Sequence, residues 1–92
     1  MKLRSVRLII SGDVQGVGYR GWIKSVATHF GLAGWAKNRP DGAVEVVLQG
    51  DGEAILKCIE KSKDGPLTAS VDGVATTDIP YDSTINDFQV LY

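Results

Sequence analysis

The 92-residue sequence predicts an α+β fold in which an antiparallel sheet carries two helices on one face. Short segments alternate apolar and polar residues, two others repeat apolar residues at helical spacing, and glycine or proline turns separate them. The composition, 43% hydrophobic and 23% charged, is typical of a globular protein. Because the length suits one core, we expect residues 1–92 to form a single domain.

The first half of the chain predicts a strand, a glycine-rich loop and a helix. Residues 3–11 alternate at a period of two, with an apolar face made by Val6, Leu8 and Ile10. Residues 12–18, GDVQGVG, predict the loop. A helix follows and ends before Gly31, because apolar residues recur at helical spacing: Trp22, Ile23, Val26, Ala27 and Phe30.

Residues 33–38 and 43–49 predict a hairpin around the turn formers of residues 39–42, RPDG. Asp51 is placed to cap a second helix that ends at residues 65–66, Gly-Pro. The apolar stripe expected on that helix consists of Ile55, Leu56, Cys58 and Ile59.

The remaining residues predict a strand over residues 69–77 and a short last strand. Asp72 and Gly73 indicate a bulge or irregularity in the longer strand, and the last strand alternates Phe88, Val90 and Tyr92. The resulting order is βαββαβ, followed by the short last strand. Right-handed crossovers place both helices on the same side of such a sheet, so we expect a ferredoxin-like sandwich.

Charge and cysteine content limit the partners and the compartment. Ten Lys and Arg residues against eleven Asp and Glu leave a formal charge of −1, which provides no overall field for nucleic acid or an anionic membrane. One cysteine, Cys58, cannot form an internal disulfide, and no apolar segment approaches the length of a membrane span. We therefore expect a cytoplasmic monomer that binds neither nucleic acid nor membranes.

The glycine-rich loop between the first strand and the first helix is suited to binding phosphate. Backbone N–H groups at a helix N-terminus lack intrahelical partners, and glycines allow several of them to converge on one anion. Arg20 follows this loop, and its planar guanidinium can donate two parallel hydrogen bonds to phosphate oxygens. The loop therefore predicts an anion site closed by Arg20.

The glycines of this loop also invite comparison with two nucleotide-binding patterns. The Walker pattern fails, because no Gly-Lys-Ser or Gly-Lys-Thr is present. Gly16, Gly18 and Gly21 match the dinucleotide fingerprint, but the acid required about 20 residues later would be Asp41, which lies in a turn. For an isolated glycine-rich loop, a simple turn with a solvated Arg20 remains the alternative.

Two segments resemble the signatures of the acylphosphatase family. Residues 12–20, GDVQGVGYR, resemble the first, and residues 34–44, GWAKNRPDGAV, followed by Gly50, resemble the second. The resemblance implies hydrolysis of acyl phosphates to carboxylate and inorganic phosphate without metal or cofactor. It implies Arg20 and Asn38 as catalytic residues, and a phosphate site made by Gln15, Gly16, Val17, Gly18, Tyr19 and Arg20.

The chemistry of Asn38 agrees with this implication. A side-chain carbonyl can accept a hydrogen bond from water and orient it without acting as a nucleophile. An acyl phosphate already has a good leaving group, so positioning and charge stabilisation suffice and the substrate phosphate can take the proton. We expect no strong protein base.

The other reactive side chains are interpreted as structural. His29 lies near the C-terminal end of the first predicted helix, where a partly charged imidazole interacts favourably with the helix dipole. Cys58 lies on the apolar stripe, without nearby groups that would stabilise a thiolate. The acidic residues are scattered, so no metal site is expected. The main alternative function is a non-catalytic module of the same fold that senses phosphate or another small anion. An RNA-binding sheet is disfavoured, because residues 43–50, AVEVVLQG, contain no aromatic residue.

Overall fold

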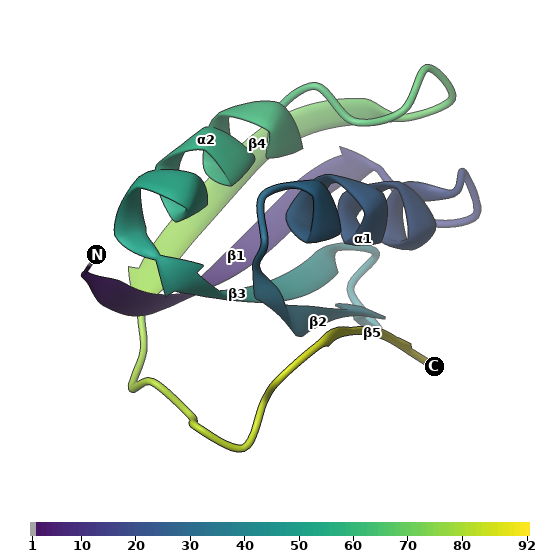
Figure 1. Cartoon of the computed structure of the whole chain (residues 1–92). Coiled ribbons are helices and arrows are strands. Elements are labelled where there is room, and N and C mark those ends of the chain that lie inside the picture. The colour runs from purple at the N-terminus through teal and green to yellow at the C-terminus, as the bar shows by residue number, and fades with distance from the viewer. Residues whose placement is uncertain (1) are drawn as a thin grey trace.

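A computed structural model of the protein describes residues 2–92, and its elements form one five-stranded sheet with two helices. In chain order the elements are β1 (Leu3–Asp13), α1 (Tyr19–His29), β2 (Ala33–Asn38), β3 (Val44–Asp51), α2 (Gly52–Ser62), β4 (Ser70–Asp78) and β5 (Phe88–Leu91). The strands lie in the order β4-β1-β3-β2-β5. Both helices cover the same face of the sheet (Figure 1), as the sequence predicts.

The sheet is mixed, because its last strand runs parallel to its neighbour. β1 pairs antiparallel with β3 and β4, and β2 pairs antiparallel with β3, but β5 pairs parallel with β2. The antiparallel expectation therefore holds for every pair except this one. The segment of residues 79–87 passes beneath the sheet, on the side away from the helices, and delivers β5 to the far edge in the direction of β2 (Figure 1).

A glutamine on β3 fixes this crossing segment to the sheet. The Gln49 side chain is 1% exposed, and its Nε2 donates to the carbonyls of Asp82 at 2.6 Å and Ile85 at 3.1 Å. Its Oε1 accepts from the Asp82 N–H at 3.2 Å. Buried amide groups need such partners, so Gln49 determines where the segment lies before β5 begins.

The core lies between the sheet and the two helices. The strand alternation predicted for β1 is confirmed, since Val6, Leu8 and Ile10 are fully buried against helix residues such as Ile23 and Ile55. Fully burying a branched aliphatic side chain stabilises the fold by roughly 1.5–3 kcal/mol. This packing holds the start of α1 firmly above the sheet.

Two local predictions for α2 are wrong, and the predicted irregularity in β4 is confirmed. Asp51 occupies the N-cap position of α2, but its side chain makes no capping hydrogen bond. Leu56 is 55% exposed and lies outside the buried stripe. In β4 the register shifts by one residue, because Ser11 pairs with Gly73 whereas Gly12 pairs with Val71, which leaves Asp72 as the bulged residue.

Candidate active site

A small polar cavity lies where the β1–α1 loop, the end of β2 and β5 meet. Its volume is about 180 Å³, and the residues that line it are Val14, Gly16, Gly18, Tyr19, Arg20, Gly21, Asn38, Val90 and Tyr92. The two side chains that the sequence singles out for catalysis, Arg20 and Asn38, therefore border one space although they come from different elements.

The pleat of β2 aims Asn38 at this cavity. Ala36, two residues earlier, is fully buried on the helix-covered face, so alternation places the Asn38 side chain on the same face at the end of the strand. The Oδ1 atom of Asn38 is buried and accepts no hydrogen bond from any group in residues 2–92. A buried carbonyl oxygen without a partner is costly, which sets this atom apart from the other polar groups of the site.

The start of α1 offers backbone donors to the same cavity. Gly18 precedes the helix in the left-handed conformation, with φ of 83°, and makes no side-chain capping bond. The first turn of α1 contains no acidic residue. Gly16 also has a positive φ, 72°. Such a glycine-bent, uncapped helix start presents free N–H groups and the positive end of the helix dipole to an anion.

Arg20 is oriented by β5. Its Nη1 donates to the carbonyl of Leu91 at 2.8 Å, and its guanidinium carbon lies 4.7 Å from the centroid of the Tyr92 ring. The guanidinium carries five N–H donors. One contact to Leu91 leaves others for an anion, so β5 holds the cation in place while leaving it able to bind.

The remaining loop residues that the sequence assigned to the phosphate site have different surroundings. Gly16, Gly18 and Tyr19 line the cavity, whereas Gln15 and Val17 do not. The Gln15 side chain points to the β2–β3 turn, and the carbonyl of Val17 accepts a hydrogen bond from Thr68 Oγ1 at 2.6 Å.

Tyr19 serves the core with its side chain. Its ring is 1% exposed, and its hydroxyl donates to the Ser62 carbonyl at 2.7 Å, which links the start of α1 to the end of α2. Burial raises the pKa of the Tyr19 phenol. The phenol is therefore a structural donor, and Tyr19 can contribute to the cavity only through its backbone or ring edge.

Sequence reasoning did not assign Val14, Gly21, Val90 or Tyr92 to the site. The alternation of Phe88, Val90 and Tyr92 predicts a strand, but it does not reveal which strand β5 joins. Parallel pairing of Ala36 with Val90 brings that face of β5 beside Asn38. Val14 lies within the first signature segment, and in the structure its side chain is 2% exposed.

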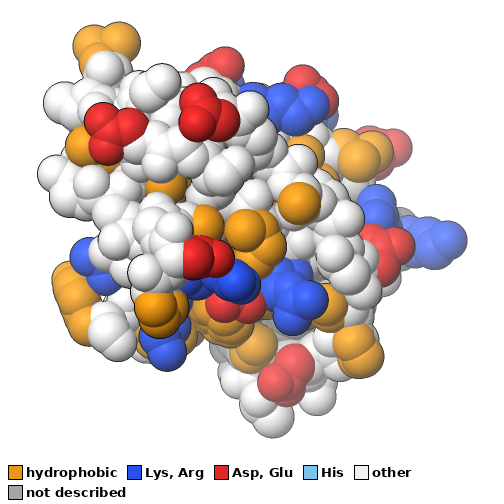
Figure 2. All heavy atoms as spheres, turned by 180° about the vertical axis from the view of Figure 1, so that it is seen from behind, with side chains coloured by type: hydrophobic (Ala, Val, Ile, Leu, Met, Phe, Trp, Pro, Cys, Tyr) orange, Lys and Arg blue, Asp and Glu red, His pale blue; other side chains and the backbone are white. Residues whose placement is uncertain are grey.

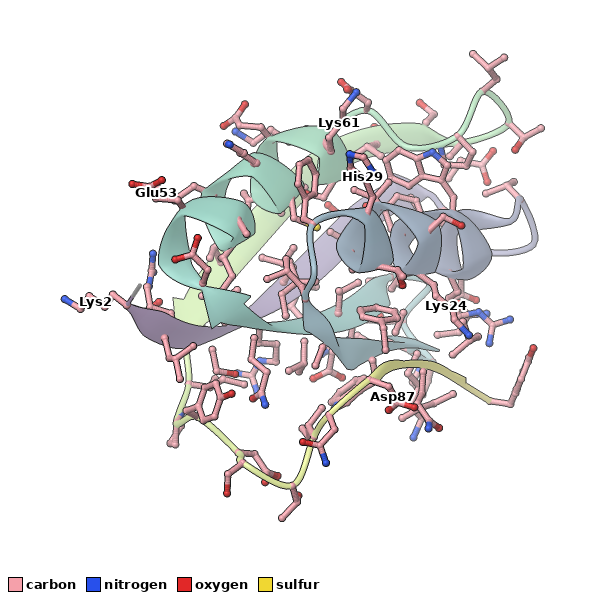
Figure 3. All side chains as sticks on the ribbon, viewed as in Figure 1. Lys2, Lys24, His29, Glu53, Lys61 and Asp87 are labelled. Atoms are coloured by element: carbon pink, nitrogen blue, oxygen red, sulfur yellow. The ribbon has the colours of Figure 1, made fainter. Side chains whose placement is uncertain are left out.

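The other reactive side chains lie away from this cavity. His29 is exposed and projects from the last turn of α1 on the side away from the sheet (Figure 3). Cys58 is fully buried in the core, and this burial raises the pKa of its thiol to about 12. Both observations agree with the structural roles predicted for these residues.

Charge elsewhere on the surface is interspersed. Lys and Arg side chains alternate with Asp and Glu on the face seen from behind (Figure 2), so no large field of one sign covers it. A larger hollow of about 500 Å³ lies at the start of α2, lined by Lys2, Arg4, Asp51, Gly52, Glu53 and Leu56. It contains neither Arg20 nor Asn38.

Residues 2–92 offer neither a cluster of metal ligands nor a membrane-spanning helix. No group of three or more His, Cys, Asp or Glu side chains in this range is arranged to hold a metal ion. Within the same range, no helix has the length and apolar character needed to cross a membrane.

The fold and the cavity define a small α+β protein that places a glycine-rich helix start and an arginine beside a strand-end asparagine. The family model named Acylphosphatase matches residues 6–90. An acylphosphatase from Rhizobium etli is 41% identical over 86 residues, covering 94% of this chain and 92% of the relative. An acylphosphatase from Pyrobaculum arsenaticum is 42% identical over 92 residues, covering 99% and 97%.

The structural comparison agrees. The crystal structure of acylphosphatase from Bacillus subtilis superposes with a TM-score of 0.92 at 34% identity, covering 99% of this chain and all of that one. The chain therefore belongs to the acylphosphatase family and is an acylphosphatase enzyme. Its family and its fold support hydrolysis of acyl phosphates.

Proposed function

We propose that this protein hydrolyses acyl phosphates at the cavity shared by Arg20 and Asn38, giving a carboxylate and inorganic phosphate. One observation carries the assignment of these residues. Side chains from two separate sequence signatures border one cavity, and the buried Oδ1 of Asn38 has no partner within residues 2–92. A hydrogen-bond acceptor and a fixed cation then face the same reacting group.

The phosphoryl group of the substrate is held by backbone N–H groups of residues 15–20 and by Arg20. The uncapped start of α1 supports this role, since its N–H groups and dipole favour an anion. Arg20 is already positioned by Leu91 and Tyr92. Donors that are fixed before the reaction stabilise charge on the phosphoryl oxygens without having to reorganise.

Asn38 orients the attacking water. Its Oδ1 accepts one hydrogen bond from the water, whose oxygen attacks phosphorus as the bond between phosphorus and the carboxylate oxygen breaks. The electron pair of that bond leaves with the carboxylate, and the water proton passes to a phosphoryl oxygen of the substrate. This route needs neither a protein base nor a metal ion, because phosphoryl transfer to a good leaving group relies mainly on positioning and electrostatics.

The size of the cavity supports broad acyl specificity. Sites that enclose a whole small molecule typically measure roughly 300–1,000 Å³, whereas this one measures about 180 Å³. Only the phosphoryl end of a substrate is enclosed, and the acyl group extends outward. A panel of carboxyl phosphates is expected to give similar kcat/KM values, and one sharply preferred substrate would contradict this.

The test is hydrolysis of benzoyl phosphate by the purified protein in excess EDTA, compared with Arg20→Gln and Asn38→Ala. Removing one preorganised charge-stabilising or positioning group costs about 100-fold or more in turnover. The matched control is Lys37→Gln, which removes an exposed cation next to Asn38 on the opposite face of β2. It should leave kcat within about twofold.

Each outcome separates the candidates. Turnover that survives chelation, collapses in both site variants and persists in Lys37→Gln supports the proposal, provided circular dichroism shows that all variants fold. A folded parent protein that binds inorganic phosphate without turnover would instead identify a phosphate-sensing module. Turnover that vanishes on chelation would refute the metal-free route.

A further inference from the structure

We propose that Gln15 is a positioning residue that fixes Asn38 relative to the phosphate loop by bracing the β2–β3 turn. The catalytic consequence of this inference rests on the proposed function above. The brace itself is a structural claim that can be tested without activity.

A single side-chain nitrogen of Gln15 joins the two segments. Nε2 donates to the carbonyl of Arg39 at 2.7 Å and to the carbonyl of Ala43 at 2.9 Å. An amide NH₂ group has two hydrogens, so both are used on this turn. Gln15 lies 24 residues before Arg39 in the sequence, and this part-buried contact links the β1–α1 loop directly to the hairpin.

The two carbonyls are the points at which the turn closes. The Arg39 N–H donates to the Ala43 carbonyl at 2.8 Å, and the Gly42 N–H donates to the Arg39 carbonyl at 3.2 Å. The Asp41 carboxylate accepts from the Ala43 N–H at 3.0 Å. Because Gln15 bonds to both closing carbonyls, it holds the whole turn as one unit.

Asn38 depends on this unit for its direction. It is joined to Arg39 by a peptide bond. Its Oδ1 has no hydrogen-bond partner within residues 2–92 that would fix the orientation of the side chain. The backbone at the end of β2 therefore sets where Oδ1 points. A displacement of about 1 Å at a reacting centre can cost on the order of 100-fold in rate, so bracing this backbone bears on turnover.

The Gln15 side chain acts through other groups, because it does not line the cavity. Its neighbours Val14 and Gly16 do line it. The brace needs an NH₂ group, since both of its acceptors are carbonyl oxygens. A carboxylate of the same shape would repel them, and a methionine of similar length would leave them only the backbone N–H donors of Gly42 and Arg39.

The kinetic test compares the parent protein with Gln15→Met, and both with the same change made in Asn38→Ala. In the parent background we expect kcat to fall about 10- to 100-fold, while the inhibition constant of inorganic phosphate changes less than about threefold. In the Asn38→Ala background we expect no further loss, because a residue acting through Asn38 has nothing left to position.

Thr68→Val is the matched control. It removes the hydrogen bond from Thr68 to the Val17 carbonyl, on the same loop but away from the hairpin. The factor by which Thr68→Val changes kcat should be the same in the parent and in Asn38→Ala, because the two residues act independently. A Gln15→Met effect that also multiplies in full, or that falls on phosphate affinity rather than on kcat, would overturn the positioning role.

Hydrogen exchange tests the brace independently of activity. The Arg39 and Gly42 amides close the turn, and their exchange, followed by NMR, should be faster in Gln15→Met at a pH where the parent is stable. Unchanged exchange would refute the brace whatever the activity. A parent protein inactive on benzoyl phosphate would refute the proposed function, and a faster exchange in that case would still establish the brace.

Discussion

The guanidinium carbon of Arg20 lies 4.7 Å from the centroid of the Tyr92 ring, and the same guanidinium donates to the carbonyl of Leu91 at 2.8 Å. α1 supplies the cation, and the end of the sheet fixes where that cation is held. Arg20 is thereby oriented before any ligand reaches the cavity, which reduces the ordering cost of binding.

Replacing Tyr92 with alanine should weaken phosphate binding. A cation–π contact at an exposed site contributes about 0.5–1 kcal/mol, so the inhibition constant of inorganic phosphate should rise about two- to fivefold in Tyr92→Ala. Tyr92→Phe keeps the ring face and should remain close to the parent. Equal losses in both variants would show that the hydroxyl, and not the ring, is responsible. Competitive inhibition of benzoyl phosphate hydrolysis measures the constant.

The Cys58 thiol should be inert in the folded protein, and its burial should make stability fall at alkaline pH. Folding raises the pKa of this thiol to about 12, from about 8.5 in an unfolded chain. Its contribution is complete below about pH 8.5 and is lost as pH rises toward 12, because the unfolded state then loses protons first. The buried Tyr19 phenol, whose pKa is also raised, acts in the same sense.

Urea unfolding at several pH values above 8 and reaction with a thiol reagent check this prediction. In Cys58→Ala the decline in the free energy of unfolding with pH should be shallower than in the parent. Rapid modification of the native thiol at pH 8 would show that the site opens readily.

Gly34→Ala should destabilise the fold far more than Gly31→Ala. Gly34 has a φ of 144°, and a Cβ there would lie 1.8 Å from the Val47 carbonyl oxygen across the β2–β3 pair. We expect a loss of more than about 2 kcal/mol in the free energy of unfolding. At Gly31, φ is 72° with open space around it, so only the left-handed backbone is penalised, by about 1 kcal/mol.

Chemical denaturation of the two alanine variants measures this difference. A Gly34→Ala protein as stable as Gly31→Ala would mean that β2 and β3 can separate locally without cost. That result would also weaken the view that β2 holds Asn38 rigidly.

Gln49→Leu should loosen the segment that leads to β5. It removes the three part-buried hydrogen bonds of Gln49 with Asp82 and Ile85, each contributing about 0.5–1.5 kcal/mol. The Asp82 carbonyl keeps the Ile85 N–H as a donor. Amide exchange across residues 79–87 should accelerate more than exchange in α1. Uniform acceleration across the chain would indicate a global effect.

Local patterns predicted much of the fold, and the two signature segments supplied the pair of residues proposed for the site. The alternation of Val6, Leu8 and Ile10 requires one buried strand face, and this is what the structure has. Arg20 and Asn38 were found from two signature segments, and the fold places them at one cavity. The strand and helix predictions succeeded because the periods of these elements depend on residues that are near one another in the sequence. The catalytic roles of Arg20 and Asn38 stay a proposal.

The remaining features depend on contacts between distant residues. Nothing near Phe88 states that β5 runs parallel to β2, since the crossing segment and Gln49 determine its destination. Gln15 was assigned to the phosphate site by its place in the motif, yet its side chain binds the turn at Arg39 and Ala43. Leu56 fits the helical spacing of a core residue but remains exposed, because no element of residues 2–92 covers that side of α2.

The walls of the cavity come from the β1–α1 loop, the end of β2 and β5, which are widely separated along the chain. Residues 14–21 supply six of the nine lining residues, and the other three, Asn38, Val90 and Tyr92, come from the end of β2 and the C-terminal segment. Bringing such distant segments together costs loop entropy before their contacts repay it. Turnover is therefore a property of the completed tertiary structure, and an activity assay on this protein also serves as a gauge of how many molecules have finished folding.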